Sequence, residues 1–242
     1  METTPIQYCF TLPDGSKHFF DLQLNTQNLE LYGCTPEILP EWTKLEFNQC
    51  PNCTISTQTH QHCPLAVNLV NIIESFERLV SYDKINVEVV TDERIVSHQT
   101  TAQKGIKSLM GLVIATCGCP HTAFFKSMVR FHLPLATREE TIYRATSTYL
   151  LAQYFLKKEG QKADLDLKGL KQIYKNIQVV NISIAERLRA ATKTDSSLNA
   201  IILLDVYAQA IPLVIEESLE EIGYLFAPFI SETGSAKDHN QH

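Results

Sequence analysis

The sequence lacks a dense run of lysine or arginine, and its formal net charge is −6. Nucleic acids and anionic membranes are bound by clustered cationic side chains, so neither is expected as a partner. The chain also lacks an uninterrupted apolar run of membrane-spanning length, because Asp205, Gln209 and Pro212 break its most apolar stretch. Its first residues have neither the basic nor the apolar region of a signal peptide. We therefore expect a soluble, cytoplasmic protein.

Motifs that would name a reaction are missing as well. The sequence contains no phosphate-binding glycine loop, no Gly-x-Ser-x-Gly elbow, no His-Glu-x-x-His and no internal repeat. Hydrophobic residues make up 44% of the chain and charged residues 20%, which is ordinary globular composition. The composition thus predicts a packed core but neither a substrate nor an oligomeric state.

The N-terminal part has the pattern of β-hairpins. Residues 7–12 and 18–24 alternate apolar and polar side chains around Asp14-Gly15, a strong turn signal. Residues 85–89 and the strand that Ile95 opens form a second candidate hairpin. Between the hairpins, Pro64 is expected to begin a helix.

Helical spacing dominates after Thr101. A capping box at residues 137–140 predicts a helix that buries the apolar positions Ile142, Ala145, Tyr149, Ala152 and Phe155. Residues 170–188 form the cleanest amphipathic pattern in the chain. Further helices are expected at residues 106–113, after Pro120 and after Asp195, with a kink at Pro212.

These patterns predict an α+β fold, in which N-terminal β-hairpins with a cysteine-rich metal knuckle precede a mainly α-helical bundle. The expected regions are residues 1–100, residues 101–230 and a disordered tail at 231–242. The first two regions can also form one unit.

Cysteine is the chemically informative residue here. The seven cysteines are Cys9, Cys34, Cys50, Cys53, Cys63, Cys117 and Cys119. An odd number in close-spaced groups, without an export signal, favours metal or thiol chemistry over disulfides. Cys50-Pro51-Asn52-Cys53 has the spacing that directs two thiolates at one ion. Cys63 follows a polar loop that a metal would hold in place.

A tetrahedral site needs a fourth ligand. Cys63-Pro64 and Cys119-Pro120 are both cysteine–proline pairs at expected helix starts, where free amides and the helix dipole favour a thiolate. We therefore predict a zinc site formed by Cys50, Cys53, Cys63 and Cys119. His62 is the alternative fourth ligand, followed by His60, Cys117 and His121, and four thiolates would also hold an iron–sulfur cluster.

Two other interpretations remain open. The cysteines can be free, buried thiols, which is the preferred interpretation for Cys9 and Cys34. Alternatively, Cys119 with a neighbouring thiol and His121 forms a redox or nucleophilic centre, with His132 as a further candidate. No thioredoxin-like βαβ pattern surrounds that cluster.

The remaining candidates are polar residues of the middle helices. His132 is expected at a helix end, where partial charge suits the helix dipole and makes it a C-terminal cap. Tyr143 and Arg144 are expected near a seam between helices, where ligand pockets are common.

Several strings resemble an uncharacterised bacterial family, a domain of unknown function, over nearly the whole chain. The strings comprise residues 41–47, 50–53, 62–64, 66–69, 118–121, 130–134 and 139–145. This resemblance implies a bacterial cytosolic protein and supplies no activity or site residues. The residues therefore suggest a non-enzymatic, zinc-binding protein with a helical surface for a protein partner or small effector. The alternative is a thiol- or metal-dependent enzyme using Cys119 and His121.

Overall fold

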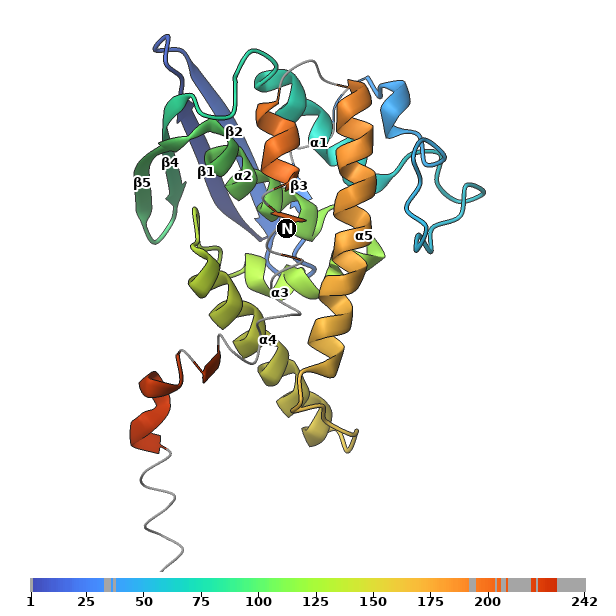
Figure 1. The fold of residues 1–242 in the computed structure, drawn as a ribbon, viewed down its shortest axis with the longest axis vertical. Coiled ribbons are helices and arrows are strands. Elements are labelled where there is room, and N and C mark those ends of the chain that lie inside the picture. Colours follow the sequence, from blue (N-terminus) through green and yellow to red (C-terminus); the bar gives the residue numbers. More distant parts are fainter. Residues whose placement is uncertain are drawn as a thin grey trace, which may run out of the picture.

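The computed structural model describes residues 2–32, 36, 38–191, 195–202, 204–205, 208, 219–220 and 222–229. Its fold is α+β, as predicted, with an N-terminal antiparallel sheet followed by helices (Figure 1). The strands are β1 (Thr3–Thr11), β2 (Lys17–Asn25), β3 (Leu31–Tyr32), β4 (Lys84–Thr91) and β5 (Ile95–Thr101). The α-helices are α1 (Pro64–Ser75), α2 (Ala102–Thr116), α3 (Lys126–Val129), α4 (Arg138–Lys158) and α5 (Lys168–Ala191). Short 3-10 helices are η1 (Glu41–Thr43), η2 (Pro120–Phe125) and η3 (Gly223–Phe226).

Both predicted hairpins are present, and the structure joins them into one sheet. The strand order is β3-β2-β1-β4-β5, because β1 pairs antiparallel with both β2 and β4. Gly15 turns the first hairpin with φ of +85°, a conformation that side chains with a Cβ disfavour. Tyr8 lies opposite Phe20 on one side and Val89 on the other, so the inward faces of the two hairpins form one apolar surface.

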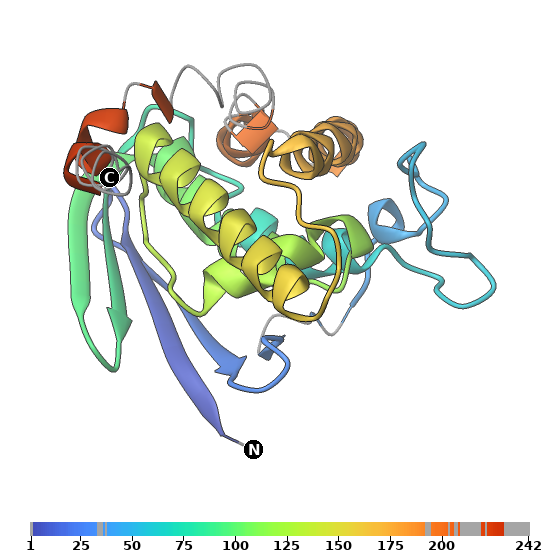
Figure 2. The same ribbon diagram turned by 90° about the horizontal axis from the view of Figure 1, so that it is seen from below.

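A single large core covers that surface. Helices α1 and α2 bury their apolar sides against the sheet, and α5 packs beside them (Figure 2). Helix α2 approaches the sheet most closely at Gly105, where an added Cβ would lie 2.9 Å from side-chain atoms of both Ile85 and Val87. The core contains residues from both sides of position 100, where the sequence suggested a boundary.

The predicted helix starts and stripes are largely present. Thr137 and Glu140 form the capping box of α4 reciprocally. The buried side of α5 includes Leu170, Ile177 and Leu188, as the spacing predicted. Pro120 does begin a helix, but it is the 3-10 turn η2, which continues into the short α3.

One packing prediction for α4 is wrong. Ile142, Ala145 and Tyr149 are buried, whereas Ala152 and Phe155 are exposed. The buried side of α4 continues through Gln153 and not through Ala152: Gln153 is buried and its Oε1 accepts the backbone N–H of Asp164 at 2.8 Å, beside the hydrogen bond from the Tyr149 hydroxyl to Asp164 at 2.8 Å. The last turns of α4 lead into the connection to α5 (Figure 1).

Asp195 precedes a helical segment that begins at Ser196, as predicted. Its carboxylate accepts the backbone N–H of Ser81 at 2.9 Å and so ties this segment to the turn before β4. The predicted kink at Pro212 and the predicted tail at 231–242 lie outside the described residues. In the described part of the chain, no single helix has the length and apolar character to cross a membrane, although the bent pair Ala102–Thr116 and Pro120–Val129 meets that test together.

Candidate functional site

The four cysteines predicted to share a metal occupy the local positions that the sequence indicated. We call Cys50, Cys53, Cys63 and Cys119 the thiol cluster. The Cys53 N–H donates to the Cys50 carbonyl at 2.9 Å, which closes the turn between the two. Cys63 is the N-cap of α1 and Cys119 is the N-cap of η2, each followed by proline. All four are free thiols.

Electrostatic coupling indicates that these thiols are neighbours in the fold. The pKa of Cys119 is raised to about 11, mainly by burial, and negative charge on Cys63 and Cys50 contributes to that rise. Burial also raises the pKa of Cys50, and charge on Cys63 or Cys53 adds to that shift. The expectation of an acidified thiol at the start of η2 is therefore wrong, because burial and like-charged neighbours outweigh the amides of one short turn.

Arg187 of α5 anchors the loop that carries Cys50 and Cys53. Its side chain is 1% exposed. Its Nη1 donates to the carbonyls of Trp42 and Lys44, both at 2.7 Å, and its Nη2 donates to the carbonyl of Leu45 at 2.9 Å. The base of the loop is thus held by protein contacts, whereas the sequence interpretation assigned that task to a metal.

Sequence reasoning missed Arg187. The available signal was an arginine on the apolar face of α5, between the buried residues Ile184 and Leu188. A charged side chain on a buried helix face needs partners, so its position implied an interior polar contact. The identity of the partners could not be read, because they are backbone carbonyls about 140 residues away.

Arg187 also faces the thiol cluster. Burial lowers the pKa of its guanidinium, and negative charge on Cys63, Cys50 or Cys53 opposes that shift. Its Nε is buried and has no hydrogen-bond partner among the described residues. A buried cationic donor therefore lies within electrostatic reach of three of the four thiols.

Two further contacts attach the Cys50–Cys53 turn to the helices. The His121 Nε2 donates to the carbonyl of Asn52 at 2.6 Å. The Asn52 amide in turn donates to the carbonyl of Asn176 in α5 at 3.2 Å. The turn is therefore fixed against η2, the element that Cys119 caps.

The alternative ligands and catalytic residues have other partners. His62 Nδ1 is hydrogen-bonded to the Thr43 hydroxyl at 2.8 Å, and His60 Nδ1 to the Thr59 hydroxyl at 2.9 Å on the exposed loop. The His121 Nε2 is occupied by the hydrogen bond to the carbonyl of Asn52. Among the described residues, no group of three or more His, Cys, Asp or Glu side chains has metal-ligand geometry. The zinc site and the thiol enzyme both stay predictions.

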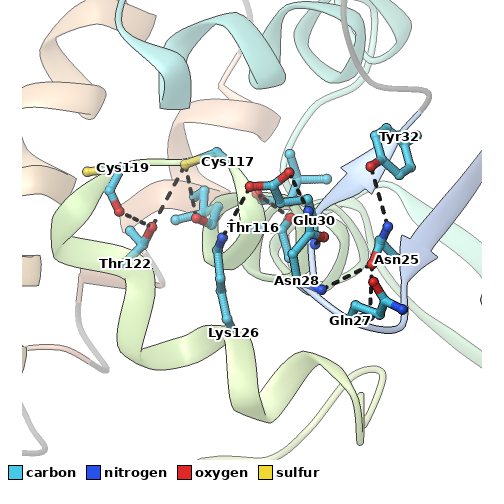
Figure 3. Close-up of polar contacts among 12 residues, drawn as sticks. Asn25, Gln27, Asn28, Glu30, Tyr32, Thr116, Cys117, Cys119, Thr122 and Lys126 are labelled. Carbon is cyan, nitrogen blue, oxygen red and sulfur yellow. Dashed lines mark hydrogen bonds and ion pairs between the residues drawn. The ribbon is translucent and has the colours of Figure 1, made fainter. Parts of the chain in front are cut away.

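Cys117 has hydrogen-bond partners of its own, although negative charge on Cys119 and Cys63 also contributes to raising its pKa. Its thiol donates to the Ile114 carbonyl at 3.1 Å and lies 3.9 Å from the Thr122 hydroxyl. Figure 3 shows the Cys119 sulfur directed away from Thr122, while the Cys117 sulfur faces it. Burial raises the pKa of Cys117 to about 12, so this thiol is protonated and inert. Cys9 is likewise buried and free, as predicted, and Cys34 lies outside the described residues.

A pocket of about 180 Å³ lies between α2, η2, α3, α4 and α5, and we call it the interhelical pocket. Most of its lining is apolar. The apolar residues include Leu112, Ala115, Phe125, Met128, Val129 and Leu133. Polar side chains from several helices also reach it: Lys107, Ser108, Thr122, His132, Thr141, Arg144, Tyr174 and Asn181. This mixture of an apolar wall and a few convergent polar groups is typical of small-molecule sites.

His132 belongs to this pocket and not to a helix end. Its Nε2 is hydrogen-bonded to the Tyr8 hydroxyl at 2.5 Å, and that hydroxyl also contacts the Ser108 hydroxyl at 3.0 Å. Burial lowers the pKa of His132 to about 3, and the charge on Arg144 contributes. The predicted charged C-terminal cap is therefore wrong: His132 is neutral and bonded to the sheet, and α3 already ends at Val129.

Arg144 lies at the predicted seam, whereas Tyr143 is exposed. The Arg144 Nη2 donates to the carbonyls of Met128 and Phe131 at 2.8 and 3.0 Å, which fixes the end of α3 against α4. Burial lowers the pKa of this guanidinium, while negative charge on Glu140 counteracts the shift. Arg144 is thus a partly desolvated cation beside an apolar pocket.

The family comparison agrees with the resemblance noted in the sequence. The family described as Domain of unknown function (DUF6901) matches residues 6–227. The chain belongs to this family. Its match spans the sheet, the thiol cluster and the helices around the interhelical pocket. No curated protein and no solved structure matches the chain.

Proposed function

We propose that this protein is a non-enzymatic, cytoplasmic binding protein with two parts. The thiol cluster holds a structural zinc ion, and the helical half binds a small effector or a protein partner. The observation that carries the metal assignment is the electrostatic coupling among Cys50, Cys53, Cys63 and Cys119, which come from three separate segments, together with the buried Arg187 that is coupled to the first three.

Charge balance supports this assignment. Four thiolates around Zn²⁺ carry a net charge of about −2, which is costly to bury without a counter-charge. Arg187 supplies one positive charge at the cluster. Its Nε has no partner among the described residues and can donate a hydrogen bond to a thiolate sulfur. Such hydrogen bonds orient metal ligands. Bound zinc would also reverse the pKa shifts, since a metal ion keeps its thiol ligands deprotonated.

The pKa directions weigh against the enzyme alternative. A nucleophilic thiol needs a lowered pKa, and burial together with neighbouring thiols raises that of Cys119. His121, the partner required as a base, donates to the carbonyl of Asn52. The effector-binding part rests on the interhelical pocket, which has the size and mixed lining of a ligand site.

Metal content and thiol reactivity test the proposal together. We expect the purified full chain to be colourless, to carry one zinc per chain and to resist alkylation until a chelator is added. Cys53→Ser should lose the metal, whereas Cys9→Ser, at a buried thiol on β1, should retain it. A brown chromophore would indicate that the four cysteines hold an iron–sulfur cluster and not zinc. Rapid alkylation of Cys119 in metal-free, folded protein would support the enzyme instead.

A further inference from the structure

The size and the lining of the interhelical pocket limit which ligands fit it. Its volume of about 180 Å³ exceeds the ~150 Å³ apolar cavity that suffices for a benzene molecule. Side chains such as Leu112, Phe125 and Met128 form the apolar wall. A compact ring or branched alkyl group therefore fits, whereas a nucleotide or a long acyl chain does not.

The charges at the pocket are of one sign. Lys107 and Arg144 line it, and none of the described lining residues is Asp or Glu. His132 contributes no charge, since its ring is neutral and bonded to Tyr8. Glu140, whose charge acts on Arg144, lies outside the lining. An occupant with a negative group is therefore favoured over a neutral or cationic one, because the partly desolvated cation at Arg144 has no carboxylate among the described lining residues.

Two nitrogen atoms of the Arg144 guanidinium remain available as hydrogen-bond donors. Both of its hydrogen bonds use Nη2, so Nη1 and Nε have no acceptor among the described residues. A guanidinium offers paired N–H groups whose spacing matches the two oxygens of a carboxylate. The contacts with Met128 and Phe131 hold the fork in place before any ligand arrives, which lowers the entropy cost of binding.

An independent observation points to a missing acceptor. Asn181 of α5 is 3% exposed and lines the same pocket. Its Nδ2 is buried and has no hydrogen-bond partner among the described residues. Buried amide donors are almost always paired, so this atom indicates an acceptor that the described part of the chain does not supply.

We propose that the interhelical pocket binds a compact aromatic or branched carboxylate. Arg144 receives the carboxylate, Asn181 donates to one of its oxygens, and the apolar residues of α2, η2 and α3 enclose the ring or alkyl group. The inference rests on the effector-binding part of the proposed function and is independent of the metal.

Calorimetric titration of the full chain with matched probes tests this assignment. The probes are phenylacetate and 3-phenylpropionate, their neutral amides, and phenethylamine as the cation of similar size. We expect the carboxylates to bind at least about tenfold more tightly than the amides, as for a charge-assisted hydrogen bond. No binding is expected for the amine.

Three variants locate the site. Arg144→Gln should weaken carboxylate binding at least about tenfold, and its control on the same helix is the exposed Arg138→Gln. Asn181→Leu removes the unpartnered donor at similar volume and should weaken binding without unfolding the protein. Gly111→Leu should block the pocket, since Gly111 lines it and an added Cβ has its nearest described neighbour, Leu204, at 3.9 Å.

Each outcome decides between distinct conclusions. Amides that bind as tightly as carboxylates, with both lost in Gly111→Leu, would overturn the anion assignment and leave the effector site intact. Carboxylate binding that Arg144→Gln, Asn181→Leu and Gly111→Leu all leave unchanged would overturn the location. If no probe binds folded wild-type protein at millimolar concentration, both this inference and the effector-binding part of the proposed function fail, and the metal assignment is unaffected.

Discussion

At the scale of single residues, Arg187 is the side chain on which the thiol-bearing loop depends most. It satisfies three backbone carbonyls at the base of the loop and lies within electrostatic reach of three of the cysteines. Arginine suits this task because its planar fork offers several donors in fixed directions, which lysine does not. Without Arg187, these three carbonyls would face helix α5 without the hydrogen bonds that it donates.

Replacing Arg187 should therefore be costly. We expect Arg187→Met to lower the free energy of unfolding by about 3 kcal/mol, because buried carbonyls lose their donors. Arg187→Lys should recover part of the loss, since it keeps the charge without the fork. Chemical denaturation measures both, with the exposed Arg189→Met on the same helix as the control. Equal stability of Arg187→Met and Arg189→Met would contradict the anchoring role.

His132 should make the stability depend on pH. Its folded pKa of about 3 lies below the ordinary value of 6.5, so the unfolded chain binds the proton more readily. The contribution to stability is complete above about pH 6.5 and is lost as the pH falls toward 3, with a slope of at most about 1.4 kcal/mol per pH unit.

Comparison of wild type with His132→Gln isolates this effect from the titration of carboxylates. The variant can still pair with the Tyr8 hydroxyl but carries no titratable group. We expect the free energy of unfolding of wild type to fall more steeply than that of the variant between pH 6.5 and 4.5. Parallel pH profiles would show that His132 is not buried in its neutral form.

At the scale of elements, helix α2 determines how closely the helical layer approaches the sheet. Two glycines of this helix differ in how much space an added Cβ would have. A Cβ at Gly105 would press on Ile85 and Val87 at 2.9 Å, while one at Gly111 has its nearest contact at 3.9 Å. The close approach at Gly105 is what allows the β4 side chains and α2 to share the core.

This contrast gives a matched pair of substitutions. Gly105→Ala should destabilise the protein by about 1–2 kcal/mol, because overpacking outweighs the gain in helix propensity. Gly111→Ala should stabilise it by up to about 1 kcal/mol, since helix propensity acts without a clash. Thermal and denaturant unfolding measure both. A stabilising Gly105→Ala would mean that the sheet yields easily at this contact.

Elements also differ in how well sequence patterns predicted them. The hairpins and α5 were read correctly, because alternation and three-and-four spacing persist over many residues. The inward side of α4 was misread past Tyr149, since the buried position of the next turn is the polar Gln153, which hydrogen-bonds Asp164. Hydrophobic periodicity marks apolar helix positions only, so a buried polar residue that pairs with a distant backbone group escapes it.

At the scale of the whole molecule, one core joins the sheet to the helices. It includes residues of β1, α1, α2 and α5, so the larger of the two cores is shared by both halves, while the small second core lies within the helical half. Both proposed sites also depend on contacts between distant segments. The thiol cluster needs the loop after η1, the start of α1 and the start of η2, and α5 contacts that loop and lines the pocket.

Unfolding should therefore be one cooperative transition that a chelator shifts as a whole. If zinc is structural, its binding free energy stabilises the entire fold, and chelation should lower the melting temperature of both halves together. The single tryptophan, Trp42, reports the loop by fluorescence, and circular dichroism reports the helices. Separate transitions by the two probes would contradict a shared core, and Cys53→Ser in chelator serves as the control.

The sequence by itself determined the local structure: the two hairpins, the capping box of α4, the stripe of α5 and the two Cys-Pro helix starts. Each depends on residues close together in the chain, where spacing and turn chemistry act directly. The tertiary structure alone decided the single five-stranded sheet, the partners of Arg187, the raised pKa of Cys119 and the neutral His132 in a pocket. Those features depend on burial and on neighbours more than 60 residues distant in many cases, such as Tyr8 and His132, 124 positions apart. Desolvation and long-range contacts are properties of the packed chain, and they reversed the charge states that local motifs had suggested.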